Sequence, residues 1–294
     1  MSVISNNAAI WRSYLELTKP GVQALLFVSC ITGMLIADNF LLKLSTLIFG
    51  LLGISLIAAS AAVINHIHDV LIDAKMLRTS ERPIVKGEIS QSSAIYFSII
   101  LYALGTFLLV YYINLLTWVL TSLTFIFYAF IYTRYLKFLT SQNIVIGGIA
   151  GAMPPLLGWT AVTGELDQEA WLLVLIIFAW TPPHFWALAI NRVDEYKEAG
   201  IPMLPVQRGI KFTKQHIVLY TLLLIVSTLL PFSIGMFGIF YLISVLILGV
   251  LFLYHSLKLY FDNSNEHAMK TFGFSIIYLA LLFIVMLIDR VLSI

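Results

Sequence analysis

The chain has few charged residues and one cysteine. Charged side chains make up 11% of the 294 residues, and hydrophobic ones make up 60%. A soluble domain usually has about 25% charged residues, so this composition excludes that class and favours a protein that lies within a lipid bilayer. The single cysteine, Cys30, excludes a disulfide within the chain and a thiolate metal cluster. We interpret it as a packing residue.

Signatures of nucleotide and permanent haem binding are also missing. The sequence has neither a Walker loop nor a dinucleotide-binding glycine fingerprint. None of its six histidines has a partner three or four residues away, which excludes a bis-histidine haem site on one helix. The net charge of +2 gives no indication of nucleic acid binding, and we expect none.

Long apolar runs dominate the remaining sequence. Nine of them reach the length of about 20 residues that a membrane helix needs. They cover 21–37, 44–64, 94–112, 115–133, 143–162, 170–190, 217–237, 238–256 and 272–291. We therefore predict an all-α, polytopic membrane protein with about nine transmembrane helices.

The basic residues indicate the orientation. With the N-terminus in the cytoplasm, nine spans leave only Lys43 and Arg290 of the 17 basic residues on the outer side. Such an excess of positive charge on the cytoplasmic side is typical of membrane proteins. The same arrangement places two long, charged segments inside, at about 66–93 and 191–216, where we expect the function to lie.

The segment that follows the second apolar run carries two carboxylates and a carboxamide at regular spacing. Asn65, Asp69 and Asp73 are four residues apart, so on a helix they share one face. On insertion scales, a carboxylate costs roughly 2.5 to 3.5 kcal/mol at the centre of a membrane helix. The pairing of two carboxylates favours a divalent metal or a polycationic partner, although a solvated helix end is the alternative.

Basic residues follow directly and could bind an anion beside that metal. Magnesium is commonly held by one or two carboxylates together with phosphate oxygens, while Arg and Lys neutralise the remaining charge. The candidates for a magnesium-bound diphosphate are Lys75, Arg78, Arg82 and Lys86, with Tyr132, Arg134 and Lys137 at the end of the fourth span. For the basic residues, the topology alone is a sufficient alternative explanation.

A second acidic cluster lies in the other inner segment. Asp194, Glu195 and Glu198 are flanked by Arg192 and Lys197 and could hold a second ion. Arg192 is also a candidate for binding the substrate. Solvated, mixed charges are the alternative. Because both segments follow an apolar helix and run from Asn through acidic and basic residues to Pro, we predict two four-helix halves plus a ninth helix. The two acidic clusters would then face each other across a central cavity.

The fifth and sixth spans contain helix-breaking residues. Pro154-Pro155 and Pro182-Pro183 remove helical hydrogen bonds, so we expect both spans to be broken helices. His184 follows the second pair among aromatic residues. It could bind a planar substrate or haem iron or act as a base, or it could be a hydrogen-bonded core residue.

Several segments together resemble the UbiA-like intramembrane prenyltransferases, and within them the protohaem IX farnesyltransferases (haem O synthases). The resemblance spans nearly the whole chain. Its most specific parts are 17–20 (Leu-Thr-Lys-Pro), 65–73 with Arg78-Thr79 and Arg82-Pro83, 142–148 (Gln-Asn-Ile-Val-Ile-Gly-Gly), 158–164 (Gly-Trp-Thr-Ala-Val-Thr-Gly), 180–186 (Trp-Thr-Pro-Pro-His-Phe-Trp) and 201–206 (Ile-Pro-Met-Leu-Pro-Val).

The resemblance implies a single intramembrane domain over 1–294 in a bacterial inner membrane. Asn65, Asp69 and Asp73 would hold Mg²⁺ on farnesyl diphosphate, while Arg78, Arg82, Tyr132 and Lys137 would bind the diphosphate. Haem b would be the acceptor substrate, positioned by His184, and haem O the product. A haem A synthase or a terminal oxidase assembly could be a partner. Many relatives carry a second Asp-x-x-x-Asp, whereas the candidates here are Asp194, Glu195 and, third, Glu198.

Two other functions stay open at this point. An ion-coupled transporter would bind its ion at intramembrane carboxylates, yet here the acidic residues gather at one membrane face beside Arg and Lys. A prenyltransferase for a quinone precursor is disfavoured only by the subfamily segments.

Overall fold

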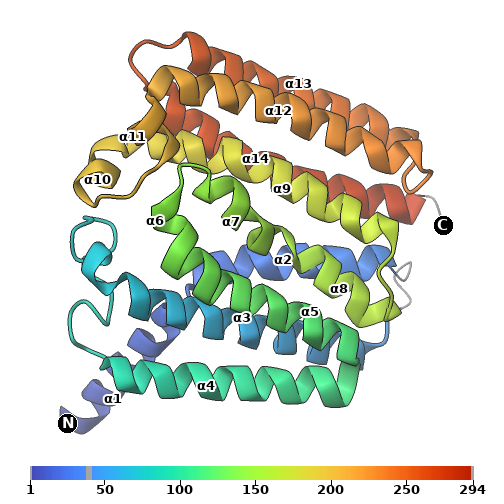
Figure 1. Ribbon diagram of the computed structural model, residues 1–294. Helices are drawn as coiled ribbons and strands as arrows, with labels where there is room; N and C mark the ends of the chain where they lie inside the picture. The colour runs from blue at the N-terminus through green and yellow to red at the C-terminus, as the bar shows by residue number, and fades with distance from the viewer. Residues whose placement is uncertain (1, 38–41, 293–294) are drawn as a thin grey trace.

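The computed structural model describes residues 2–37 and 42–292, which fold into a bundle of helices without strands in these ranges (Figure 1). The elements are α1 (Ser2–Leu17), α2 (Pro20–Ala37), α3 (Leu44–Asp73), α4 (Gln91–Leu108), η1 (Leu109–Ile113), α5 (Leu115–Ile126), η2 (Phe127–Leu136), α6 (Lys137–Leu139), α7 (Asn143–Ala152), α8 (Pro154–Thr163), α9 (Gln168–Asn191), α10 (Val193–Glu198), α11 (Leu204–Arg208), α12 (Ile210–Ser233), α13 (Ile239–Phe261) and α14 (His267–Leu292). The segments η1 and η2 are π-helices.

The predicted nine spans are confirmed within the described part of the chain. Nine helical segments there are long and apolar enough to cross a membrane. Several boundaries differ from the prediction, most of all the end of α3 and the start of α12. Helix α3 continues to Asp73, so 66–73 is helix and not loop, and α12 begins at Ile210, which shortens the second inner segment. In both cases the helix extends through polar residues that lie outside the apolar run on which the prediction was based.

The two proline pairs have different effects. The fifth span is broken as predicted, because α7 ends at Ala152 and α8 begins at Pro154. The expectation of a broken sixth span was wrong, since α9 runs through Pro182-Pro183 without interruption. Helices α7, α12 and α14 pack against α9 along its length. This packing supports a continuous helix where the backbone lacks two donors.

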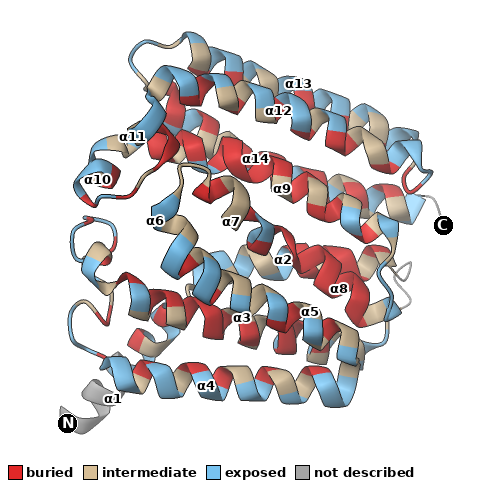
Figure 2. Ribbon diagram, in the orientation of Figure 1, coloured by how far each residue is buried: buried red, intermediate tan, exposed pale blue. Residues whose placement is uncertain are grey.

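Burial separates a core layer from outer helices (Figure 2). Helices α8 and α9 and the inward face of α3 are largely buried, while α4, α12 and α13 expose much of their surface. The exposed side chains are apolar, for example Phe107 of α4 and Val250 of α13. An apolar outer surface suits contact with lipid tails. The division into two four-helix halves around a central cavity stays a prediction.

Two glycines allow α2 and α8 to approach each other closely. A Cβ atom at Gly158 of α8 would lie 2.2 Å from the carbonyl oxygen of Cys30 on α2, and one at Gly33 would lie 2.1 Å from the carbonyl oxygen of Pro155. Small residues at helix interfaces drive packing in membranes, where apolar burial contributes little. Cys30 is buried at this contact, in agreement with a packing role.

We predict that Gly158→Ala destabilises the protein. The new methyl group overlaps backbone that cannot move without separating α2 from α8, and overpacking of this kind costs about 1–3 kcal/mol. Thermal unfolding in detergent measures the effect. Gly273→Ala in α14 is the matched control, because nothing lies within 4 Å of its Cβ position. Equal unfolding temperatures for the two variants would contradict the prediction.

Candidate active site

One face of α3 presents three polar side chains at the end of the bundle. Asn65, Asp69 and Asp73 lie on this helix, as their spacing predicts, and each is only 4% exposed. The helix reaches beyond its apolar run because these residues find partners in other segments. All three line a pocket of about 350 Å³.

Each of the three residues contacts a basic side chain from a different segment. Lys137 Nζ lies 2.8 Å from Asp69 Oδ2. Arg82 forms an ion pair with Asp73, and Lys19 donates a hydrogen bond to Asn65 Oδ1. Charge-assisted contacts of this kind offset the cost of burying carboxylates.

The amide of Asn65 links the acidic face to η2. Its Nδ2 group donates to Asp69 Oδ2 at 2.9 Å and to Thr133 Oγ1 at 3.1 Å. Thr133 in turn donates to the carbonyl oxygen of Tyr128 at 2.8 Å. This network fixes the amide orientation, so Oδ1 of Asn65 faces Lys19.

The donor set fits a magnesium ion that completes its shell with substrate oxygens. Asp69 Oδ1 is buried without a hydrogen-bond partner, which marks a position where an ion would be stabilised. No group of three or more His, Cys, Asp and Glu side chains comes together within 2–37 and 42–292. An ion here would therefore depend on Asn65, Asp69, Asp73 and phosphate oxygens, as Mg²⁺ commonly does.

The pocket brings together most of the predicted diphosphate-binding residues. Arg78, Arg82, Tyr132 and Lys137 all line it. Lys75, by contrast, is exposed and does not line it, and Arg192 lies 3.9 Å from Glu195 instead.

The second acidic cluster does not reach the pocket in this structure. Asp194 and Glu198 are exposed, and Glu195 is half-buried. From the same segment, Tyr196, Ile201 and Met203 line the pocket instead. A surface-facing α10 explains this, because only its Tyr196 side is buried. Burial raises the pKa of Tyr196.

His184 also lies outside the pocket lining. Its ring stacks between Trp180 at 4.3 Å and Phe272 at 4.5 Å between centroids, and its Nδ1 lies 2.7 Å from Ser275 Oγ. Because the Ser275 hydroxyl donates to the carbonyl oxygen of Phe272, Nδ1 is the donor and Nε2 carries the lone pair. The neighbouring Trp180 and Phe185 do line the pocket.

Lys19 was missed as a site residue. It lines the pocket at the junction of α1 and α2, and burial lowers its pKa to about 7. The available signal was its place in the Leu-Thr-Lys-Pro segment, where a lysine directly precedes an apolar helix. Its contact with Asn65 spans 46 residues and could not be derived from spacing.

Tyr132 is held by the wide turn of η2 and by Gly147. A Cβ atom at Gly147 of α7 would lie 2.3 Å from the Tyr132 ring, so only glycine leaves room for it. The ring also stacks on Tyr128, with centroids 5.7 Å apart. Segments of π-helix frequently occur at functional sites, where they re-aim side chains.

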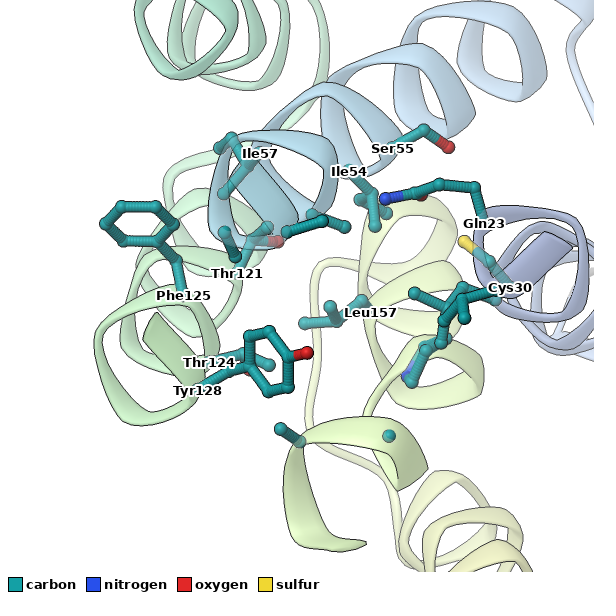
Figure 3. Close-up of a pocket in the computed structure, with 18 of the residues that line it drawn as sticks. Gln23, Cys30, Ile54, Ser55, Ile57, Thr121, Thr124, Phe125, Tyr128 and Leu157 are labelled. Atoms are coloured by element: carbon teal, nitrogen blue, oxygen red, sulfur yellow. The ribbon is translucent and has the colours of Figure 1, made fainter. Parts of the chain in front are cut away.

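A second, apolar pocket of about 130 Å³ adjoins the first (Figure 3). Its walls come from α2, α3, α5 and α8, with Ile54, Ile57, Thr121, Phe125 and Leu157 among them. Lys19 and Tyr128 line both pockets and so stand at their junction. The arrangement suits a ligand with a charged head and an apolar tail.

These features define a polytopic helical membrane protein with a cation-lined acidic pocket, and the comparisons identify its family. Residues 26–286 match the model of the UbiA prenyltransferase family. The chain therefore belongs to the UbiA prenyltransferase family.

Relatives are similar over almost their whole length. A protoheme IX farnesyltransferase from Legionella pneumophila (strain Paris) is 55% identical over 280 residues, which covers 95% of each protein. Another from Alcanivorax borkumensis is 54% identical over 97% of this chain and 94% of its own length.

Solved structures share the fold. A digeranylgeranylglyceryl phosphate synthase matches with a TM-score of 0.82 at 24% identity, over 96% of this chain and 99% of its own. A UbiA homolog from Archaeoglobus fulgidus bound to GPP and Mg²⁺ matches with a TM-score of 0.65 at 17% identity, over 93% of this chain and 99% of its own.

We predict that Gly147→Ala lowers turnover by roughly tenfold or more, because the methyl group displaces the Tyr132 ring and small misplacements in a site can cost up to about 100-fold. Steady-state prenyl transfer measures the loss. Gly273→Ala in α14 is the control, since nothing lies within 4 Å of its Cβ position and it lines neither pocket. Equal activity in both variants would show that Tyr132 does not depend on Gly147.

Proposed function

We propose that the protein transfers the farnesyl group of farnesyl diphosphate to a vinyl group of haem b, giving haem O and diphosphate. The observation that carries this proposal is the identity of about 55% to protoheme IX farnesyltransferases over 95% of the chain. The acidic face of α3 and its basic surroundings supply the chemistry that an allylic diphosphate requires.

Mg²⁺ is the expected cofactor. UbiA homologs have been solved with Mg²⁺ together with DMAPP or GPP. Here Asn65, Asp69 and Asp73 would hold the ion, and Asp194, Glu195 and Glu198 are the candidates for a second one. When bound, magnesium would stabilise the charge that develops on the leaving diphosphate.

Basic side chains of the pocket would also stabilise the leaving diphosphate. Arg78, Arg82 and Lys137 would bind the diphosphate oxygens and neutralise them as the C1–O bond breaks. The bonding electrons leave with the diphosphate, and an allylic farnesyl cation remains. Tyr132, packed against Gly147, would hold its ring beside the reacting carbon.

The acceptor completes the reaction without a redox step. The vinyl π electrons of haem b form the new C–C bond to C1, which leaves a cation on the porphyrin side. Water adds to this cation and loses a proton, so a hydroxyethylfarnesyl group results. Haem is thus a substrate and not a fixed cofactor, with His184 as the proposed positioning residue beside Trp180 and Phe185.

The two pockets suggest a division between tail and head. The apolar pocket would take the farnesyl chain, and the larger pocket would take the diphosphate and the reacting edge of haem. Lys19 and Tyr128 at their junction would then lie near the bond that breaks.

The proposal includes a setting in the cell. We propose a single domain in a bacterial inner membrane, with the N-terminus and the active site at the cytoplasmic face and the C-terminus outside, because this orientation keeps 15 of the 17 basic residues inside. A haem A synthase or a terminal oxidase assembly would receive the product.

The decisive test is the reaction itself. Purified protein with haem b, farnesyl diphosphate and magnesium should yield farnesylated haem by mass spectrometry, and a metal chelator should abolish it. Asp69→Ala and Asp73→Ala should each lose roughly 100-fold or more in rate, because each removes a carboxylate that holds the metal. Glu165→Gln, an exposed residue away from both pockets, is the control. Absence of product from folded wild type would reject the function.

Ala58→Phe should change the preferred chain length. Ala58 is half-buried and lines the apolar pocket, so a phenyl ring there fills space that a third isoprene unit would need. In competition, we expect the product ratio to shift by roughly tenfold from farnesyl towards geranyl, the range that differences in pocket fit provide. Leu52→Phe, on the exposed side of the same helix, is the control. An unchanged product ratio would contradict the proposal that the farnesyl chain lies in this pocket.

A further inference from the structure

Lys19 occupies an unusual backbone conformation at the turn between α1 and α2. Its φ of 55° lies in the left-handed region, which among the described non-glycine residues only Asn265 shares. Lysine does not favour this region, so surrounding structure must maintain it. Strain of this type concentrates at functional positions.

Contacts of α1 hold this turn in place. Ser13 Oγ donates to Glu88 at 2.7 Å, and the Tyr14 ring meets Phe97 edge to face at 4.9 Å. Leu17, the last residue of α1, is fully buried. The Lys19 carbonyl oxygen then accepts from Val22 and Gln23 and so begins α2.

The turn directs Lys19 onto an oxygen that a metal would need. Nζ donates to Asn65 Oδ1 and lies 3.4 Å from the Tyr128 hydroxyl. Since Nδ2 of Asn65 is already bonded to Asp69 and Thr133, Oδ1 is its only ligand atom. An ammonium group and a divalent cation cannot both occupy that oxygen, because their charges repel.

We propose that Lys19 is a positioning residue. Without substrate, its ammonium group donates to Asn65 Oδ1, and when substrate binds, it leaves that oxygen and contacts the diphosphate. The inference rests on the proposed function. Lys137 contacts Asp69, and Arg82 contacts Asp73, in the same way that Lys19 contacts Asn65. These three cations preorganise the site and partly neutralise it, so metal alone binds weakly and metal with diphosphate binds tightly.

Binding of Mn²⁺ alone, followed by electron paramagnetic resonance on full-length protein in detergent, tests this. Lys19→Met should bind Mn²⁺ about tenfold more tightly than wild type, because the ion no longer displaces a charge-assisted hydrogen bond. Adding inorganic diphosphate should strengthen Mn²⁺ binding less in the variant than in wild type, since Lys19 no longer contacts the anion. Unchanged or weaker Mn²⁺ binding in Lys19→Met would overturn the proposal.

Two control variants separate the occupancy of Asn65 Oδ1 by Lys19 from other effects on Mn²⁺ binding. Arg78→Met removes a positive charge that lines the same pocket. If it raises the affinity for Mn²⁺ as much as Lys19→Met does, the gain comes from the lower positive charge of the pocket, and the proposed exchange of Lys19 is rejected. Lys211→Met, an exposed lysine of α12, should leave Mn²⁺ binding unchanged. If Lys19→Met does not fold, Lys19→Asn replaces it, because Asn tolerates positive φ.

Failure of the exchange differs from failure of the function. If wild type farnesylates haem b and Lys19→Met binds Mn²⁺ as wild type does, only the exchange is rejected. If wild type makes no farnesylated haem yet the two Mn²⁺ affinities differ as expected, the exchange stands for another diphosphate substrate.

Discussion

The structure depends on the burial of two carboxylates and one carboxamide at the end of α3. Asp69 and Asp73 would be unstable there without cationic partners. Lys137, 68 residues further along the chain, pairs with Asp69, and Arg82, nine residues further along, pairs with Asp73. These contacts tie α3 to α6 and to the loop after α3. The fold thus holds an acidic face and a basic one together at one end of an apolar bundle.

Packing of small residues lets the bundle come close enough for this. Gly33 and Gly158 bring α2 against α8, and Gly147 leaves room for Tyr132 over α7. The first contact sets the wall of the apolar pocket, and the second aims an aromatic ring into the polar one. A chain with an apolar tail and a charged head therefore meets matching surroundings on the two sides of Lys19 and Tyr128.

The membrane-protein class, nine spans and the acidic face could be predicted because they depend on local composition and spacing. Asn65, Asp69 and Asp73 share a helix face whatever surrounds them. The continuity of α9 through Pro182-Pro183 could not be predicted, since neighbouring helices decide whether lost backbone hydrogen bonds break a helix. The position of the second acidic cluster could not be predicted either, because a run of mixed charges does not show which side of α10 faces the pocket.

By itself, the sequence determined the apolar length of each span, the helical register of the acidic residues and the excess of basic charge near them, all of which are properties of neighbouring residues. Only the tertiary structure decided which cation meets which oxygen. Lys19 reaches Asn65 across 46 residues because α1 ends in a left-handed turn beside α3. His184 turns to Ser275 of α14 and not into the pocket because Trp180 and Phe272 enclose its ring. Such contacts join distant segments, and their geometry follows from packing.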